Sequence, residues 1–563
     1  MALADKTSLV RQLLDEAWLR FRRRMIATGS IRIGGPAPQR LMIVPPDLRV
    51  GDPAIAQEIY SGVFHFAGRS VNASGSNPFR QRPPSRPWLD ELHAFGWMRH
   101  LAAAQGPLAA SNAQALVRDW LEANPRPKRS RVWDPETTAR RLIAWLCHSI
   151  LILDKADLRF YRAVLRSVGQ HIRFLKQAAP VTEDGVPKLL VHIALAYASL
   201  CVQSKPGAIR QALRNLDAEL AYQILPDGGH ISRNEACLPE VAALLLPLRQ
   251  SIARLGREPS NQLVSAIDRI MPAIRFHRMG DGNFARMNGI SATPRDLVLT
   301  VLRHDDTGGH IPEEAPHSGY QRLAAGETVV VADAGMAPAG EISAHAHAGC
   351  LSFEMSCGAA PIVVNCGAPA LTGDKAAFVA RTTPAHSTAT LNDVSSCRFA
   401  MHGFAGALLS GRIISGPRRV GVRRDQDETG TVLSMLHDGY LSRFGLVHHR
   451  SLRLSPDGMK LQGLDRFLGP DGRPRPKLGR DGATIRFHLH PSVSAARTET
   501  LERVMLFAAG SVRLSFECLA VEPQLEESIF FAATGGPRRC SQIVLQFSTT
   551  EVPEVTWTFT RAA

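Results

Sequence analysis

Residues 343–355 read SAHAHAGCLSFEM, in which two histidines and a glycine lead into an apolar, strand-like run. Runs of this kind, rich in β-branched residues and bounded by Gly, Pro, Asp and Asn, fill the chain after residue 290. They cover 327–333, 350–356, 361–365, 387–392, 431–436, 446–454, 484–489, 503–508, 511–517, 542–548 and 554–560. Because no helical pattern lies between them, residues 291–563 are predicted to form an antiparallel β-sandwich.

Upstream of this region the apolar residues recur at helical spacing. Eight segments follow that period, at 88–103, 115–123, 136–153, 160–178, 187–203, 208–225, 238–256 and 260–279. Short links are typical of antiparallel neighbours, so residues 71–290 are predicted to form helical hairpins that curve into an incomplete (α/α) toroid. Residues 1–70 are expected to form an N-terminal flap that begins with an amphipathic helix, and a Pro- and Ser-rich loop at 71–87 separates this flap from the helices. The predicted fold is therefore multidomain, first α and then β.

The composition is ordinary for a globular protein, with 45% apolar and 21% charged residues over 563 positions. Lys and Arg outnumber Asp and Glu by 66 to 51, which gives a net charge of +15. This surplus favours an anionic partner, although the dispersed arginines are equally consistent with a GC-rich genome. Nucleic acid is the least favoured partner, because no basic region carries interleaved stacking aromatics. The sequence makes no prediction of the oligomeric state.

The sequence also bears on location. No apolar stretch reaches the roughly 18 residues that a membrane-spanning helix requires, so no transmembrane segment is expected. The N-terminus lacks a basic segment followed by an apolar core, which is the pattern of a secretory signal. A cytoplasmic location is therefore expected, or a periplasmic one if the true start or the export route differs.

The motifs of P-loop and dinucleotide-binding proteins, HExxH metalloproteases and GxSxG hydrolases are missing, which leaves three polar clusters. The first cluster is 227–234, DGGHISRN, at the junction of two helical segments. Arg233 and Asn234 could bind a carboxylate there, and His230 could move a proton. The alternative is a tight turn between helices, in which Asn234 caps the next helix.

The second cluster is the pair His345 and His347. In an extended segment the two imidazoles would face the same side, where they could share a metal or act as acid and base. The alternative is two surface histidines at the start of a strand.

The third cluster is diffuse and lies at predicted strand edges. It comprises Asn365, His386, His449 and Arg450, each of which could equally be an ordinary polar residue of a sheet. Tyr320 precedes a strand near the domain junction. Its phenol could donate or accept a proton when a nearby cation lowers its pKa, or its ring could simply pack in the core.

These residues and their order resemble the heparinase II/III family of polysaccharide lyases. The family's His-x-His stretch before a Ser-Phe strand looks like His345–Phe353, and its Asp-x-Gly turn looks like Asn365–Gly367. Its later His-Ser-Thr motif looks like His386–Thr388, and its helical Asp-Gly turn looks like Asp227–Gly229. The resemblance is most specific over 340–395 and architectural over 90–560, and it implies a toroid followed by a β-sandwich.

The resemblance implies β-elimination on a uronate-containing glycan in a cleft between the two domains. The expected partner is therefore an anionic polysaccharide or oligosaccharide, and a divalent metal such as Zn or Ca is implied in the β domain. The resemblance implies that His345 or His347 is a base or a metal ligand, and that Asn365 and His386 match metal-binding positions. Where lyase residues are missing, His230, Arg233 and Asn234 are candidates to neutralise the carboxylate, and Tyr320 is a candidate acid. The predicted site therefore comprises catalytic residues His345, His347, His230 and Tyr320, substrate-binding residues Arg233, Asn234, His449 and Arg450, and metal-binding residues His347, Asn365 and His386.

Three departures from the family favour a second hypothesis. Leu190–Ile193 contains no Asn where lyases carry an Asn-rich patch, no Tyr follows the Asp227 turn at the lyase spacing, and Asn365 replaces an Asp. The alternative is a catalytically degenerate glycan-binding or polysaccharide-assembly protein with the same fold.

Overall fold

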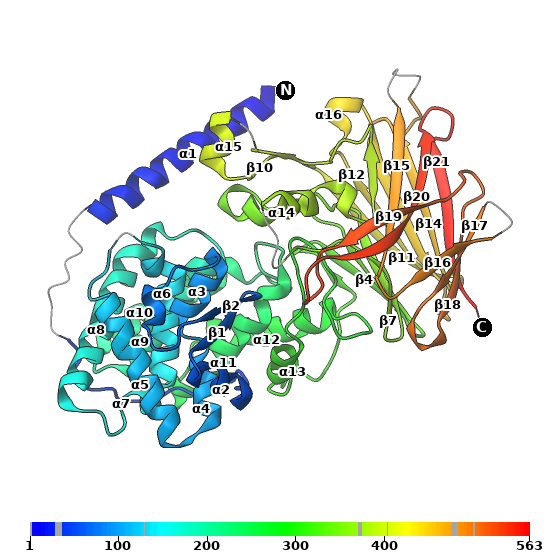
Figure 1. Ribbon diagram of the computed structural model, residues 1–563. Helices are drawn as coiled ribbons and strands as arrows, with labels where there is room; N and C mark the ends of the chain where they lie inside the picture. Colours follow the sequence, from blue (N-terminus) through cyan, green and yellow to red (C-terminus); the bar gives the residue numbers. More distant parts are fainter. Residues whose placement is uncertain are drawn as a thin grey trace.

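The computed structural model describes residues 3–28, 37–128, 130–369, 374–401, 403–475, 481–498 and 502–562. Helices gather at one end of the molecule and two large sheets at the other, in the order that the sequence predicts (Figure 1). The structure therefore confirms the fold class, an α domain followed by an antiparallel β domain.

The N-terminal part contains α1 (Leu3–Thr28), α2 (Pro53–Tyr60) and the hairpin of β1 (Val63–Phe66) with β2 (Arg69–Asn72). Phe64 and Phe66 of this hairpin are buried against Trp88 and Trp97 of the helical domain. The hairpin thus shares one hydrophobic core with the helices that follow it.

The helical domain is built in two layers. Most residues of α6, α9 and α11 are buried, whereas α8 and α10 bury only one face, so α6, α9 and α11 form an inner layer. The helices are α3 (Arg86–Ala94), α4 (Met98–Ala104), α5 (Gly106–Ala123), α6 (Pro135–Cys147), α7 (Ser149–Leu153), α8 (Leu158–Ala178), α9 (Val186–Cys201), α10 (Pro206–Gln223), α11 (Leu238–Arg254), α12 (Asn261–His277) and α13 (Arg295–Leu302).

All eight predicted helical segments are present, but two of them are interrupted. The segment 88–103 breaks at Phe95, whose φ of 59° lies in the left-handed region, and the segment 136–153 breaks at His148. Among the described residues, the helical stretch Glu235–Arg254 is the one long and apolar enough to cross a membrane, and 67% of its apolar window is buried inside the protein.

The β domain consists of two antiparallel sheets packed face to face. One sheet has the order β11-β12-β13-β14-β21-β18-β17-β16, and the other β19-β20-β15-β7-β6-β5-β4-β3, with β8 paired to β15. Their strands are β3 (Glu314–Ala315), β4 (Tyr320–Ala325), β5 (Thr328–Asp333), β6 (Phe353–Cys357), β7 (Ala360–Val364), β8 (Ala389–Leu391), β11 (Val420–Asp427), β12 (Gly430–His437), β13 (Val447–Leu454), β14 (Lys460–Leu468), β15 (Gly482–Leu489), β16 (Ser494–Arg497), β17 (Arg503–Phe507), β18 (Arg513–Glu517), β19 (Gln524–Phe530), β20 (Arg538–Ser548) and β21 (Glu554–Arg561). Residues from both sheets, such as Phe353 and Trp557, share one core.

The eleven predicted strands are all found, while other elements escaped prediction. The edge strand β11 is largely exposed and carries the polar run RRDQD, so it lacks the apolar alternation by which a strand is recognised. The sheets are also flanked by α14 (Asp374–Arg381), α15 (Gly403–Leu409), α16 (Leu441–Phe444) and the short pair β9 (Arg398–Phe399) and β10 (Ile413–Ser415).

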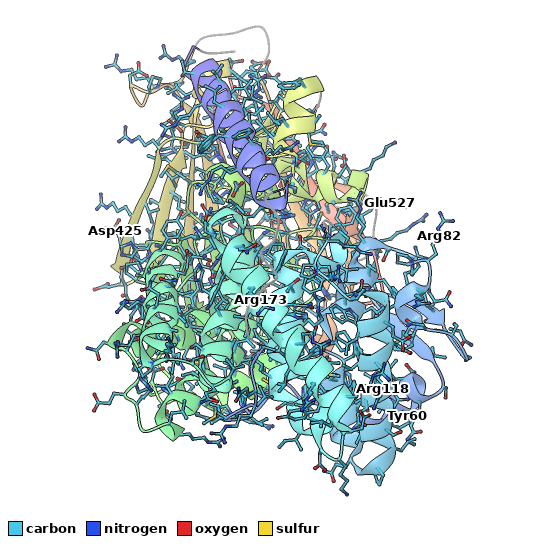
Figure 2. All side chains as sticks on the ribbon, turned by 90° about the vertical axis from the view of Figure 1, so that its left-hand side faces the viewer. Tyr60, Arg82, Arg118, Arg173, Asp425 and Glu527 are labelled. Carbon is cyan, nitrogen blue, oxygen red and sulfur yellow. The ribbon has the colours of Figure 1, made fainter. Side chains whose placement is uncertain are left out.

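Helix α1 docks against the β domain through its polar side. The buried Glu16 accepts a hydrogen bond from Arg412 at 2.6 Å, and Arg20 donates to the carbonyl of Leu408 in α15 at 2.5 Å. The opposite side exposes more than half of each of four apolar side chains, Val10, Leu14, Trp18 and Phe21. Figure 2 shows α1 crossing the flank of the molecule, where it also contacts α8.

Candidate functional site

Several of the residues predicted to form the site lie at the joint between the two domains. Arg233, in the turn between α10 and α11, extends its guanidinium into the β domain. It donates to the carbonyls of Ser318, Gly319 and Met336, and it pairs with Asp333 of β5 at 2.5 Å. Arg233 is only 6% exposed, so it binds the β domain rather than a ligand.

A chain of hydrogen bonds continues from this ion pair into the β domain. Asn288 donates to Asp333 at 3.2 Å and to the Tyr320 hydroxyl at 2.9 Å, and its oxygen accepts from the backbone of His347. The Tyr320 hydroxyl itself donates to the Arg233 carbonyl at 2.5 Å, and Nδ1 of His347 faces Nε2 of His386 at 3.1 Å. The members of this interdomain network are Arg233, Asn288, Tyr320, Asp333, His347 and His386.

Burial holds the proton-transfer candidates of the joint in their neutral forms. It raises the pKa of Tyr320 far above that of free phenol, although the charge of Arg233 opposes this shift. Burial lowers the pKa of His386 to about 4 and that of His347 well below its ordinary value. His230 is also fully buried, between Ser232 and Gln223, and burial lowers its pKa to about 4.

His345 and His347 end in different surroundings, which corrects the expectation that they face the same side. The segment Gly340–His345 is a 3₁₀ helix rather than an extended strand. His345 is exposed, whereas His347 is 4% exposed and belongs to the interdomain network.

The predicted metal ligands do not fit a divalent cation. Nδ1 of His386 faces the carbonyl oxygen of Thr382 at 2.8 Å, so it carries the proton and Nε2 must accept from His347. The lone pair of His386 is therefore already used. Asn365 contributes no charge, and its side-chain oxygen accepts from the backbone of Ser387. Among the described residues no group of three His, Cys, Asp or Glu side chains has a metal-binding arrangement.

Two predicted substrate-binding residues lie on β13. Arg450 faces the interior of the sandwich, and His449 faces outward. Arg450 is fully buried, pairs with Asp465 at 2.8 Å and donates to the carbonyls of Leu351 and Ser387. It therefore stabilises the β domain. His449 is partly exposed on the opposite face of the same strand, since neighbouring residues of a strand alternate.

The turn at Asp227–Gly229 also serves the domain joint. One carboxylate oxygen of Asp227 accepts from the backbone of His317 and Ser318 at 2.8 and 2.6 Å. The side chain of Asn234 caps the short helix that follows. This is the alternative that the sequence offers beside carboxylate binding. The same backbone hydrogen bond recurs after α12. The Met279 amide donates to the Asn283 carbonyl there, as the Leu225 amide donates to the Gly229 carbonyl after α10.

A large cavity lies in the helical domain. It measures about 810 Å³ and is enclosed by the β1–β2 hairpin, α3, α4, α6 and α11, with Pro294 at the junction with the β domain. Its walls are rich in charged and titratable groups: Arg49, Arg99, Arg131 and Arg140, Asp90, Glu91, Asp134, Glu136 and Glu240, and His65 and His100.

His345 lies within electrostatic reach of this cavity. Desolvation and the charge of Arg381 lower the pKa of His345, while the Glu136 carboxylate in the cavity wall opposes the shift. Among the four predicted catalytic residues, His345 alone is exposed.

Sequence reasoning missed the charged wall of the cavity. One signal was available at Arg140 and Arg141, which interrupt the apolar stripe of 136–153. Arg141 is fully buried and donates to His171 and to the carbonyl of His93, whereas Arg140 reaches the cavity. Periodicity alone does not distinguish these two environments.

The comparisons with known proteins agree with this architecture. Residues 307–558 match the family described as heparinase II/III-like, C-terminal. Heparinase III superposes with a TM-score of 0.69 at 12% identity, over 97% of this chain and 88% of that one. The heparan sulfate lyase HepC from Pedobacter heparinus gives a TM-score of 0.60 at 15% identity, with the same two coverages. The chain therefore shares the fold of these proteins, a helical toroid followed by an antiparallel β-sandwich.

A relative is found at higher identity. FtsZ-localized protein C of Caulobacter vibrioides is 31% identical over 527 residues, which make up 92% of this chain and 89% of the relative. The chain belongs to the heparinase II/III-like family.

Proposed function

We propose that this chain is a glycan-binding protein of the heparinase fold that no longer performs β-elimination. The observation that carries the proposal is the burial of the predicted acid and base at the domain joint. Tyr320 and His347 are 0% and 4% exposed, and both bond to neighbouring protein groups.

Elimination requires a base that reaches the substrate carbon, a donor for the leaving oxygen and a partner for the carboxylate. The hydroxyl of Tyr320 is committed to a backbone carbonyl, and the guanidinium of Arg233 is committed to Asp333. We therefore place the glycan in the cavity of the helical domain, which has the size and polar lining of a ligand site.

The test combines a binding measurement with a product measurement. Purified protein is incubated with unsulfated and sulfated uronate polysaccharides, and the ultraviolet absorbance of unsaturated uronate is followed beside calorimetric binding. We expect binding without any rise in absorbance. Any steady rise would contradict the loss of elimination, and a rise that persists in Tyr320→Phe would locate the chemistry elsewhere.

The named relative supports a proposal about location. Because this chain aligns with nearly the whole of FtsZ-localized protein C, we propose that it localises with FtsZ. A fluorescent fusion imaged beside labelled FtsZ tests this, and a signal spread evenly through the cell would contradict it. The cytoplasmic location expected from the sequence is a prediction that the same images test.

One observation favours a second candidate, a lyase that uses a different site. His345 is exposed near the cavity, and its lowered pKa keeps it neutral and able to accept a proton. If unsaturated uronate forms, His345→Ala should abolish it whereas Tyr320→Phe should leave it unchanged.

A further inference from the structure

We propose that helix α1 is a latch for the segment Gly340–His345: docking of α1 on the β domain holds this segment in place, and release of α1 loosens it. The segment ends in His345, the exposed histidine near the cavity. The inference does not depend on glycan binding, because it concerns contacts within the chain itself.

Helix α1 is held on the β domain by polar contacts. Among its described side chains only Glu16 is buried, and none of its apolar side chains belongs to a hydrophobic core of the described structure. Gln12 donates to the carbonyl of Ile413 at 3.3 Å, and Arg20 donates to the carbonyl of Leu408 at 2.5 Å. Because little apolar surface is buried here, α1 can leave its docked position at a lower cost than a core helix.

One arginine connects α1 to the segment. Arg412, between α15 and β10, is 7% exposed and lies between two carboxylates. Its Nη2 donates to Glu16 at 2.6 Å and to Glu341 at 3.4 Å. The other oxygen of Glu341 accepts from the backbone of Asp184 in the helical domain at 3.2 Å. Arg412 thus joins α1 to a segment that also contacts the helical domain.

The next residue along the chain makes a second connection. The backbone N–H of Ile413 donates to the hydroxyl of the buried Ser343 at 3.1 Å, and its carbonyl accepts from Gln12 of α1. Helix α1 and the segment therefore bind the same two residues, Arg412 and Ile413. In Figure 1, α1 lies beside α15 and β10, the elements that flank these two residues.

A further arginine limits what the release of α1 does. Arg381 of α14 donates to the carbonyls of Ser343 and Ala346 at 2.9 Å each. These bonds do not involve α1, so its release should loosen the segment and leave the β domain folded. Coupling between two sites is reciprocal, so a change in the segment should also loosen α1.

Hydrogen–deuterium exchange of the full chain, read by mass spectrometry, tests the latch. Glu16→Gln removes the charge that binds Arg412 and keeps the shape of the side chain. We expect exchange in peptides covering 340–347 to become about 10- to 100-fold faster, the usual effect of losing a hydrogen bond between charged groups. The matched control is Asp15→Asn on the same helix, because Asp15 is exposed and lies 4.0 Å from Arg11. This control should exchange as the unaltered protein does.

Glu341→Gln tests the coupling in the opposite direction, and it does so even where Glu16→Gln fails to fold. Trypsin cuts a helix only after it has left its docked position or frayed, so cleavage after Arg11 and Arg20 should become faster by a similar factor. The exposed Glu527→Gln is the control, which should leave the cleavage rate unchanged (Figure 2). An unfolding curve for each variant shows that it is folded.

Three results would overturn the latch. One is equal exchange over 340–347 in Glu16→Gln and Asp15→Asn, and another is cleavage of α1 that Glu341→Gln does not accelerate. The third is faster exchange throughout the β domain of Glu16→Gln, because this would indicate a general loss of stability rather than the release of one segment.

Discussion

Glu235, in the turn between α10 and α11, is a fully buried carboxyl group with a strongly raised pKa. Burial raises its pKa to about 8, although a hydrogen bond from the backbone of His230 opposes the shift. Its second oxygen has no hydrogen-bond partner in the described structure. The folded protein therefore keeps a proton on Glu235 that the unfolded chain releases near its ordinary pKa of 4.5.

This difference predicts the effect of Glu235→Gln. Between pH 4.5 and 8 the unfolded state binds fewer protons, so Glu235 makes the protein less stable as the pH rises. Glutamine keeps the acceptor and removes the titration, so the variant should be more stable by roughly 1–3 kcal/mol at pH 8 and about equally stable at pH 5. Urea unfolding at both pH values measures this. The exposed Glu527→Gln is the control, and an equal gain for Glu235→Gln at both pH values would contradict the prediction.

A second residue-scale prediction concerns the Arg233–Asp333 pair. Asp333→Asn leaves the guanidinium of Arg233 buried without its counter-charge, which typically costs about 3–5 kcal/mol. Denaturant unfolding should show this loss. The double variant Arg233→Met with Asp333→Asn should recover part of it, because no unpaired charge remains, and a further loss in the double variant would contradict this account.

The residue scale is also where sequence reasoning was weakest. The sequence identified Arg233, Tyr320, His347 and His386 as notable, and the structure brings all four into one network. It could not show that they bond to one another, because that depends on how a turn of the helical domain seats against a sheet. His345 and His347 illustrate the same limit, since a local 3₁₀ helix separates two residues that a strand would have aligned.

Among the elements, the Asp227–Gly229 turn carries much of the fit between the domains. Gly228 has a φ of +82°, and a Cβ there would lie 1.9 Å from the carbonyl oxygen of Arg269 in α12. Both the backbone conformation and the close approach therefore require glycine.

Gly228→Ala should destabilise the protein by several kcal/mol, because it combines backbone strain with a clash against backbone atoms. The control is Gly207→Ala in α10, where an added Cβ meets nothing within 4 Å and alanine favours the helix. Thermal unfolding should show a large drop in Tm for the first variant and none for the second. Equal Tm values for the two variants would show that the backbone of α12 moves to accommodate a Cβ at residue 228, and would contradict the prediction.

Helices and strands were predicted best, because the spacing of apolar residues along the sequence reflects which face of each element is buried. The inner helix α9 and the strands of the sandwich core carry long apolar patterns, and each was found near its expected place. Boundaries failed where tertiary packing decided them, as at Phe95, which packs against Trp97 and Trp145 and ends α3 in a left-handed conformation.

For the whole molecule, buried histidines set the response to acid. Burial lowers the pKa of six of them to between about 3 and about 4: His93, His100, His230, His277, His386 and His488. Below pH 6.5 these histidines bind protons in the unfolded chain but stay neutral in the folded protein. The free energy of unfolding therefore falls as the pH drops.

We therefore expect the free energy of unfolding to decrease steadily from about pH 6.5 to about pH 4, with several protons taken up on unfolding. The opposing effect of Glu235 is smaller, since it involves one group. Urea titrations at half-unit intervals of pH give the slope directly. A flat profile over this range would show that the histidines are solvated in the folded protein.

The position of α1 has a consequence for the order in which the molecule is made. Glu16 leaves the ribosome early, yet its partner Arg412 follows 396 residues later. Until Arg412 has been synthesised, the carboxylate of Glu16 lacks this partner. Helix α1 thus completes its docking only after the strands and helices between it and Arg412 have been synthesised.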